Sequence, residues 1–306
     1  MNKKISCCYL YPITKYGYPP DANNTLKYIQ EMGALGFSSI ELEGIRKDHL
    51  LKVYSIQSDI KRKIDELNLN VSYYCAVLPG LSSLDEKEVN RNLALFEKGC
   101  ETALVIGAKG ILDNAPLPPY QFPAEIPVTR HYEEDTLQYA SFPAGFDWKI
   151  FNDRLINTFR TLCDIASRYN LTYQLHPAIG VMASTTDGFL KFFDEVKRDN
   201  LRFNFDTANL FAQKEILHLS LYKLKGLVDY IHVSDNGGFH VEHLPIGTGK
   251  INWEKFFEAL DKIGFDGSFG VDIGGDESNI LDLDDSYKKA AEFLENNWFK
   301  HYREVN

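Results

Sequence analysis

The sequence predicts a closed (β/α)8 barrel, an α/β fold in which eight parallel strands alternate with helices. Short runs rich in β-branched and aromatic residues alternate along the chain with longer helical patterns, which indicates βα units and a parallel sheet. Eight such units fit within the 306 residues, about the length of a barrel of this kind. A doubly wound open sheet is the alternative, but the glycine-rich first turn typical of that fold is missing.

The first half of the chain supplies four predicted strands. The run ISCCYLYP (5–12) predicts the first strand. The helix predicted at 23–36 begins beside Asn and Asp residues and ends near Gly33 and Gly36, which are residue types common at helix termini. The same alternation then predicts strands at 38–44, 69–77 and 109–115 and helices at 47–67 and 86–107.

The second half repeats the pattern with four further strands. A helix at 150–169 leads into the strand TYQLHP (172–177), and strands follow at 201–206, 229–235 and 268–274. Helical patterns occupy residues 186–198, 213–226, 252–264 and 286–299. Because no composition shift marks a linker, residues 1–306 are predicted to form a single barrel domain with one interruption.

The interruption is a long excursion at about residues 116–148. It contains half of the twelve prolines, including those of PLPPYQFPAEIP, and several aromatic residues. A connection of this length inside a compact domain is usually functional or disordered. The aromatic content suits packing over a neighbouring surface, so a lid and a subunit interface both remain open.

The composition argues against a protein that binds nucleic acid, is secreted or spans a membrane. Hydrophobic residues make up 44% of the chain, enough for a full core, and the net charge of −10 argues against nucleic acid as a partner. The N-terminal stretch lacks a signal-peptide core, and no apolar run is long enough to cross a membrane. Five cysteines without metal-site spacing are expected to be reduced thiols, so we expect a cytoplasmic protein.

Polar side chains recur near the C-terminal ends of the predicted strands, where barrel active sites form. Strand residues alternate between two faces, and in five strands the apolar residues share one face while polar residues share the other. Burying such polar groups is costly unless each finds a partner. The polar residues are Glu41 and Glu43, Gln174 and His176, Asn204 and Asp206, His232, and Asp272.

A divalent metal would satisfy four of these residues together, namely Gln174, Asp206, His232 and Asp272. Mixed oxygen and nitrogen ligands suit Mn, Mg, Co or Zn. Each residue also has a structural alternative, such as a satisfied buried pair for Asp206 and His232. Gln174 could instead bind the substrate or orient His232. His176 shares the face of Gln174, and its imidazole could act as a base or an acid.

Several segments together resemble the xylose-isomerase-like barrel superfamily. They are GALGFSSIELEG, YQLHP, FNFDTANL, DYIHVSD and PIGTGKINWEKFFEALDKIGFDGSFGVDI. That superfamily includes sugar-phosphate isomerases and epimerases, ketose 3-epimerases, inosose dehydratases and apurinic endonucleases. The resemblance covers nearly the whole chain outside 116–148, and its most specific piece is the GTGKINW…GFDG segment.

The resemblance implies a set of site residues. In the sugar-acting branch a divalent metal is held by Glu, Asp, His and Glu on strands five to eight, and the two glutamates also move the proton beside a carbonyl. By position this chain offers Gln174, Asp206, His232 and Asp272, so the two outer residues depart from that pattern. We therefore predict His176, Asp272 and Glu43 as catalytic residues and Glu41, Asn209 and His243 as substrate contacts.

We predict a metal-dependent sugar isomerase or epimerase that transfers a proton beside a carbonyl through a metal-bound enediolate. The alternatives are a lyase in the same barrel, either an inosose-type dehydratase or an enzyme that cleaves 3-keto-glycosides, and a barrel that binds a sugar without chemistry. The expected partner is a small sugar or polyol ketone rather than a nucleic acid or a membrane. A homo-oligomer is compatible with the sequence.

Overall fold

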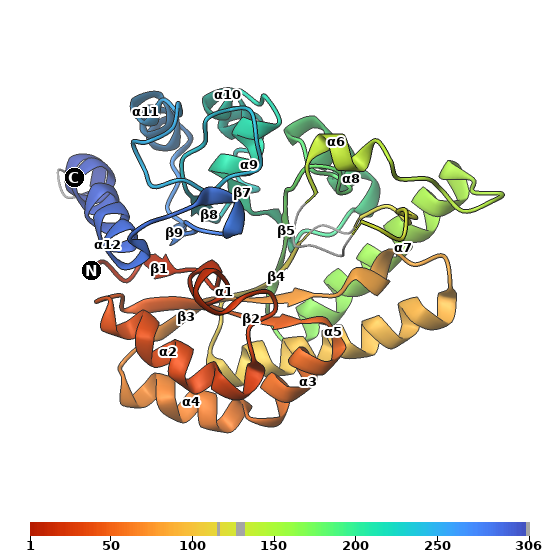
Figure 1. Ribbon diagram of the computed structural model, residues 1–306, viewed down its shortest axis with the longest axis horizontal. Coiled ribbons are helices and arrows are strands. Elements are labelled where there is room, and N and C mark those ends of the chain that lie inside the picture. The colour runs from red at the N-terminus through yellow and green to blue at the C-terminus, as the bar shows by residue number, and fades with distance from the viewer. Residues whose placement is uncertain (115–116, 127–131, 304–306) are drawn as a thin grey trace.

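Strands alternate with helices in a barrel that has the strands inside and the helices outside (Figure 1). The computed structural model describes residues 1–114, 117–126 and 132–303. The strands are β1 Ile5–Cys7, β2 Ser39–Ile45, β3 Asn70–Val77, β4 Gly110–Asn114, β5 Thr172–His176, β6 Leu201–Phe203, β7 Phe205–Asp206, β8 Tyr230–Val233 and β9 Ser268–Val271.

The sheet is parallel and nearly closed on itself, which confirms the predicted barrel. Its strand order is β6-β5-β4-β3-β2-β1-β9-β8-β7. The two edge strands, β6 and β7, are consecutive stretches of one predicted strand, separated only by Asn204. The backbone N–H of Asn204 donates to the carbonyl oxygen of Leu175 at 2.9 Å. Eight sequential strand segments therefore complete the barrel.

The predicted alternation of faces holds in β5. Tyr173 points outward, where its ring packs against Phe96 of α5 and Phe159 of α7, with centroid separations of 5.2 and 5.8 Å. Gln174 and His176 take the other face and are buried. In β5 the aromatic side chain of Tyr173 thus lies under the helices, while the polar side chains of Gln174 and His176 line the barrel interior.

The helices surround the barrel, and Asp side chains begin several of them. Asp85 and Asp147 accept backbone N–H groups in the first turns of α5 and α7, as N-caps do. The helices are α1 Leu10–Tyr16, α2 Thr25–Ala34, α3 Arg46–Ser55, α4 Gln57–Glu66, α5 Glu86–Ile106, α6 Glu134–Leu137, α7 Trp148–Arg168, α8 Thr186–Val196, α9 Thr207–Ala212, α10 Leu217–Lys223, α11 Trp253–Ile263 and α12 Leu283–Leu294, followed by a π-helical stretch at Glu295–Arg303.

Three predicted boundaries were wrong. The strand predicted at 5–12 ends at Cys7, and Leu10–Tyr16 is helical; Pro12 has no N–H to donate to a strand ladder. The helix predicted at 47–67 is two helices that meet at Ile56. The helix predicted at 213–226 is shorter and is α10, and it is preceded by a further helix, α9, which Asp206 caps and which the sequence pattern did not predict.

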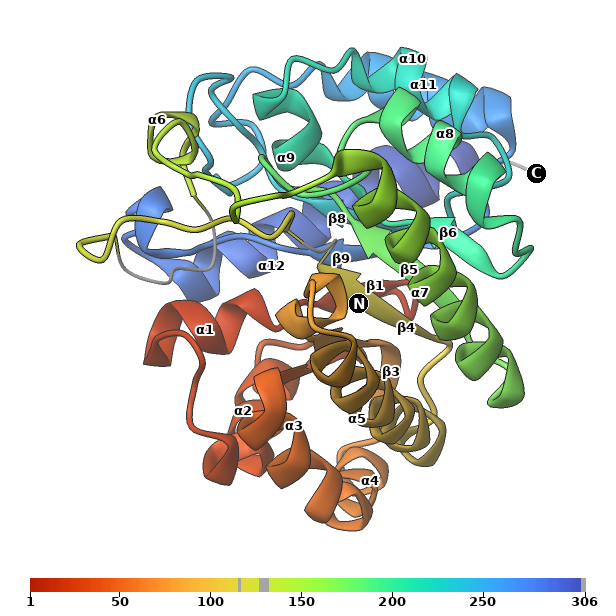
Figure 2. The same ribbon diagram turned by 90° about the vertical axis from the view of Figure 1, so that its right-hand side faces the viewer.

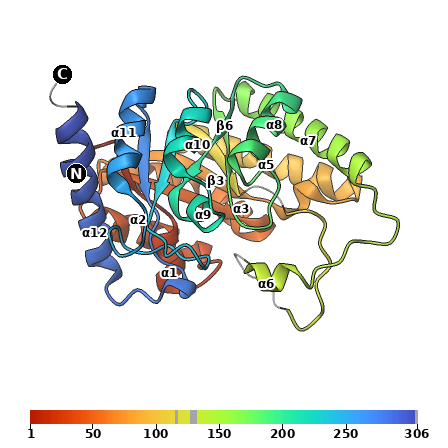
Figure 3. The same ribbon diagram turned by 90° about the horizontal axis from the view of Figure 1, so that it is seen from above.

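The predicted excursion lies on the same side of the barrel as α1, which follows the C-terminal end of β1 (Figures 2 and 3). Residues 116 and 127–131 of it lie outside the described residues. In the described part, Gln121 and Ser141 form an antiparallel bridge. Glu133 accepts the backbone N–H of Val241 at 3.1 Å, so the excursion touches the loop that follows β8.

Two further observations bear on the class of protein. No helix in the part of the chain that the structure describes is long and apolar enough to cross a membrane. All five cysteines are buried thiols outside any disulfide, as the sequence predicts.

Candidate functional site

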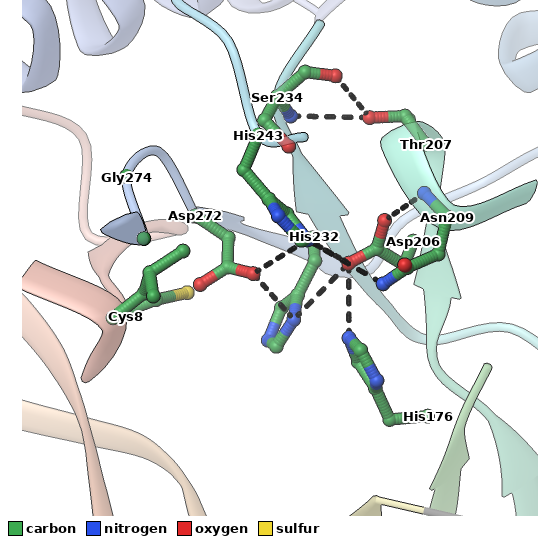
Figure 4. Close-up of polar contacts among 12 residues, drawn as sticks. Cys8, His176, Asp206, Thr207, Asn209, His232, Ser234, His243, Asp272 and Gly274 are labelled. Atoms are coloured by element: carbon green, nitrogen blue, oxygen red, sulfur yellow. Dashed lines mark hydrogen bonds and ion pairs between the residues drawn. The ribbon is translucent and has the colours of Figure 1, made fainter. Parts of the chain in front are cut away.

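Four polar side chains from neighbouring strands meet at the C-terminal end of the barrel (Figure 4). Each is at most 4% exposed. Every one of them offers a ligand-type atom, and these atoms all lie within 4.8 Å of one another. We call this group the mouth cluster; it consists of His176 of β5, Asp206 of β7, His232 of β8 and Asp272, which follows β9.

Asp206 is the centre of the mouth cluster. Its Oδ2 lies 2.9 Å from Nε2 of His176 and 3.9 Å from Nδ1 of His232. Its Oδ1 accepts the backbone N–H of Asn209 at 2.7 Å, so Asp206 is also the N-cap of α9. Burial alone would raise the pKa of the Asp206 carboxyl, but the hydrogen bond from His176 and the nearby imidazoles hold it below its usual range. Asp206 is therefore a charged carboxylate in a buried site.

His232 presents one ring nitrogen to the cluster and the other to Glu41. Its Nε2 lies 2.9 Å from Oε2 of Glu41, whereas its Nδ1 lies 3.6 Å from Oδ2 of Asp272. Among the described residues this Nδ1 has no hydrogen-bond partner. Burial would lower the pKa of His232, but the surrounding carboxylates, Glu41 and Asp272 first, raise it to about 9. The surroundings of this nitrogen thus favour a positive charge.

His243 reaches the cluster from the loop between β8 and α11. It is fully buried, and its Nε2 lies 3.8 Å from Oδ2 of Asp206 and 3.9 Å from Oδ2 of Asp272. Its Nδ1 lies 3.6 Å from Oε1 of Glu277. Nδ2 of Asn209 is 3.4 Å from Nε2 of His243. The structure therefore brings together Asn209 and His243, the two downstream residues predicted to contact substrate, beside the cluster.

The buried carboxylate of Asp235 holds the loop that carries His243. It accepts four hydrogen bonds, and the donors are the backbone N–H groups of Asn236, Gly247 and Ile251 and the indole Nε1–H of Trp253. On its other side the loop pairs with the strand end after β9, through a bridge between His243 and Gly274. The GTG turn at 247–249 is thus part of the frame that places His243 over the cluster.

Gln174, predicted as a metal ligand, makes its contact at a different level of the barrel. Its Nε2 donates to Oδ1 of Asp229, the residue just before β8. In register Gln174 stands opposite Arg202, four residues before Asp206. Its neighbour on the same face, His176, is two residues nearer the C-terminal end and joins the cluster. This placement does not support Gln174 as a ligand, and His176 takes its position in the proposal below.

The second strand supplies the two predicted glutamates, and both are buried. Glu41 was predicted as a substrate contact, but the structure places it against His232. Glu41, His232 and Cys8 also form a second group of ligand-type atoms within 4.8 Å. Glu43 lies two residues further along β2. Burial raises the pKa of Tyr9, and the negative charge of Glu43 is the next largest cause. The catalytic role of Glu43 stays a prediction.

The mouth cluster fits a divalent cation. Two imidazoles and two carboxylates are a common ligand set for transition metals. An unpartnered buried nitrogen, Nδ1 of His232, lies between the carboxylates of Asp206 and Asp272. The carboxylates favour a positive charge at this nitrogen, and a bound cation would supply that charge in place of a proton.

Comparison with known proteins gives a family and a set of similar folds. A family described as xylose isomerase-like TIM barrel matches residues 29–297. An uncharacterized protein of Methanocaldococcus jannaschii is 29% identical over 148 residues, which cover 47% of this chain and 49% of that protein. A ketose 3-epimerase of Arthrobacter globiformis is 28% identical over 78 residues, 26% of this chain and 25% of the epimerase. The matches therefore span half or less of these curated relatives.

Solved structures match over almost the whole chain. The apo form of 3-keto-D-glucoside 4-epimerase from E. coli has a TM-score of 0.71 at 17% identity, covering 96% of this chain and 99% of the other. A structure of L-ribulose 3-epimerase has a TM-score of 0.73 at 17% identity, covering 98% and 96%. The IOLI protein with a bound zinc atom has a TM-score of 0.70 at 18% identity, covering 98% and 99%. At these identities the likeness shows the fold alone.

Proposed function

Because the chain belongs to the xylose isomerase-like TIM barrel family, we propose that it is a metal-dependent enzyme that moves a proton beside the carbonyl group of a sugar, as an isomerase or epimerase does. The observation that carries the proposal is the mouth cluster, with two imidazoles and two carboxylates buried at the end of the barrel where active sites form. Structural neighbours named as sugar epimerases support the substrate class.

The four residues of the mouth cluster would hold the cation. A cation bound there would polarise a carbonyl oxygen and stabilise the negative charge that develops when the adjacent carbon loses its proton. Among the predicted metals, Zn and Co are favoured over Mg, because His176 and His232 offer imidazole nitrogen and Mg prefers oxygen ligands.

His243 is the group that we propose to carry the proton. Since His176 is occupied in the cluster, the acid or base must come from another side chain. Nε2 of His243 faces the carboxylates of Asp206 and Asp272 at 3.8 and 3.9 Å, and Glu277 lies 3.6 Å from its Nδ1. An imidazole in this place can remove a proton at Nε2 and return it. Nδ2 of Asn209, beside it, would donate to a substrate hydroxyl.

A lyase reaction in the same barrel is the second candidate function. The residues at the two positions where relatives carry glutamate favour this candidate. Relatives that act on sugars are expected to use two glutamates to move protons on both sides of a carbon, whereas this chain has Gln174 and Asp272 at those sequence positions. One proton-carrying group is enough for isomerisation or for expulsion of a β-leaving group. Inosose-type dehydration and cleavage of 3-keto-glycosides are reactions of the latter kind.

The first experiment measures bound metal. Purified protein is analysed by mass spectrometry of its metals, before and after incubation with Zn²⁺, Co²⁺ or Mn²⁺, beside the double variant Asp206→Ala, His232→Ala. We expect about one ion per chain in the wild type and none in the variant. Gln174→Leu is the matched control, since it removes an interior polar side chain outside the cluster, and it should keep the ion. No ion in the wild type with any of the three metals would refute the site.

The second experiment separates the two reactions. The loaded enzyme is incubated with ketoses and 3-keto-glycosides in deuterated water, and products are followed by mass spectrometry and NMR. Isomerisation or epimerisation yields a product of equal composition that takes up deuterium, whereas elimination releases a second product. Sugar binding without deuterium uptake or a product would contradict both reactions and indicate a binding protein.

A further inference from the structure

Glu41 lies behind a cluster histidine, on the opposite side of the ring from the carboxylates. Its side chain is 2% exposed, and its Oε2 lies 2.9 Å from Nε2 of His232. The other ring nitrogen, Nδ1, lies 3.6 and 3.9 Å from the carboxylates of Asp272 and Asp206. We infer that Glu41 is a positioning residue, which keeps the proton of His232 on Nε2 and so directs the Nδ1 lone pair at the cation. The inference rests on the cation site of the proposed function.

The hydrogen bond decides which nitrogen is free. A neutral imidazole carries one proton, and a carboxylate can only accept it. When a bound cation takes the place of the second proton of His232, Oε2 of Glu41 keeps the remaining proton on Nε2, and Nδ1 is left with its lone pair. Nδ1 has no partner of its own among the described residues. A carboxylate behind a ligating histidine also raises the basicity of the ring and fixes its orientation.

Packing fixes the plane of the same ring. The ring of Tyr230 meets His232 edge-on, with centroids 5.1 Å apart and planes at 81°. His176 approaches from another side, also at 5.1 Å. With the ring plane held by these two neighbours and the proton held by Glu41, Nδ1 has one orientation, toward Asp206 and Asp272.

Gly270 makes room for two side chains that lie beside this contact, Cys8 and Tyr230. Glu41 belongs to β2 and His232 to β8, with β1 and β9 between them in the sheet. Gly270 of β9 is the register partner of His232. A Cβ at this position would collide with Sγ of Cys8 and the hydroxyl of Tyr230. The glycine thus lets Cys8 and Tyr230 lie close to the ring of His232 and to Glu41.

The test measures cation affinity and the protonation of one ring. Zn²⁺ binding is measured by competition with a chromophoric chelator for the wild type, Glu41→Ala and Glu41→Gln. We expect Glu41→Ala to bind Zn²⁺ about 10- to 100-fold more weakly, the loss typical when the partner behind a ligating histidine is removed. Glu41→Gln keeps the volume and an acceptor oxygen but loses the charge, so it should recover part of the affinity.

A spectroscopic measurement separates positioning from a general structural effect. In ¹⁵N-histidine NMR spectra of the Zn²⁺-loaded protein, we expect His232 to carry its proton on Nε2 in the wild type and to lose this signature in Glu41→Ala. Asp113→Asn is the matched control, because Asp113 is also a buried carboxylate but hydrogen-bonds Tyr173 on the outer face of the barrel. It should destabilise the protein and leave Zn²⁺ affinity within about twofold of the wild type.

The outcomes distinguish this inference from the function it rests on. If the wild type binds no cation, both the proposed site and the role of Glu41 are overturned. If the wild type binds Zn²⁺ and the folded Glu41→Ala and Glu41→Gln variants bind it equally well, the role of Glu41 alone is overturned. A proton found on Nδ1 of His232 in the loaded wild type would also overturn it.

Discussion

Protonation of His49, in α3, should destabilise the protein below neutral pH. The residue is 8% exposed, and its Nδ1 accepts the backbone N–H of Ile45 at 3.1 Å. Burial lowers the pKa of His49 from 6.5 to about 4, because an imidazolium loses its hydration there. Protonation would also place a hydrogen on Nδ1 and break the hydrogen bond from Ile45.

The size and sign of the effect follow from the two pKa values. The unfolded chain binds the proton with a pKa near 6.5 and the folded protein only near 4, so unfolding takes up a proton between these values. The contribution of His49 is therefore complete above about pH 6.5 and is lost progressively as the pH falls toward 4. A difference of this size corresponds to roughly 3 kcal/mol of unfolding free energy.

The assay is denaturant unfolding of the wild type and His49→Gln between pH 7 and pH 4. Glutamine keeps an acceptor for the N–H of Ile45 but does not titrate, so its unfolding free energy should fall by roughly 3 kcal/mol less over this range. The control is His218→Gln, at an exposed position of α10, which should follow the wild type. Equal pH dependence in His49→Gln and the wild type would refute the reasoning.

Three further predictions concern a residue that holds the loop of His243, a buried hydrogen bond on the outer face of β5, and a proposed metal ligand. Asp235→Asn should lower the unfolding free energy by about 2–3 kcal/mol in denaturant titrations, since the carboxylate that accepts four hydrogen bonds is lost. The same variant should reduce turnover more than metal content, and full activity would contradict the role assigned to its loop. Tyr173→Phe should cost about 1–3 kcal/mol in the same assay, because the buried Asp113 loses its donor, with unchanged bound metal as the check. His176→Glu should keep a bound cation and shift the ratio of Zn²⁺ to Mn²⁺ affinity toward Mn²⁺; an unchanged ratio would remove His176 from the ligand set.

Most of the fold follows from local patterns. The strand LRFNFD shows why, since Phe203 and Phe205 share one face and Asn204 and Asp206 the other, as a strand with an apolar outer layer requires. The boundaries that failed depend on single side chains that a periodic pattern does not register. Pro12 has no N–H for a strand ladder, and the carboxylate of Asp206 accepts the backbone N–H of Asn209 and so begins α9 directly after β7.

The candidate site was predictable in part for the same reason. Asp206, His232 and Asp272 come at or just after the ends of their strands, and the structure brings these three side chains together. Alternation assigns a side chain to a face but not to a height along the barrel. Gln174 and His176 share a face, and the register of β5 against β6 sets Gln174 opposite Arg202, so that His176 is the one that reaches the cluster.

The local sequence was therefore sufficient to predict the barrel, because strand patterns and helix patterns alternate along it. It was also sufficient to predict the inner and outer faces of the strands and the end at which polar groups gather, because successive strand residues point to opposite faces. The sequence did not predict which side chains Glu41 and His243 contact. Glu41 meets a histidine 191 residues away, and the loop of His243 is buried by hydrogen bonds to Asp235 and a bridge to Gly274. Such contacts form only when the barrel closes, since closure sets which distant side chains share the same interior space.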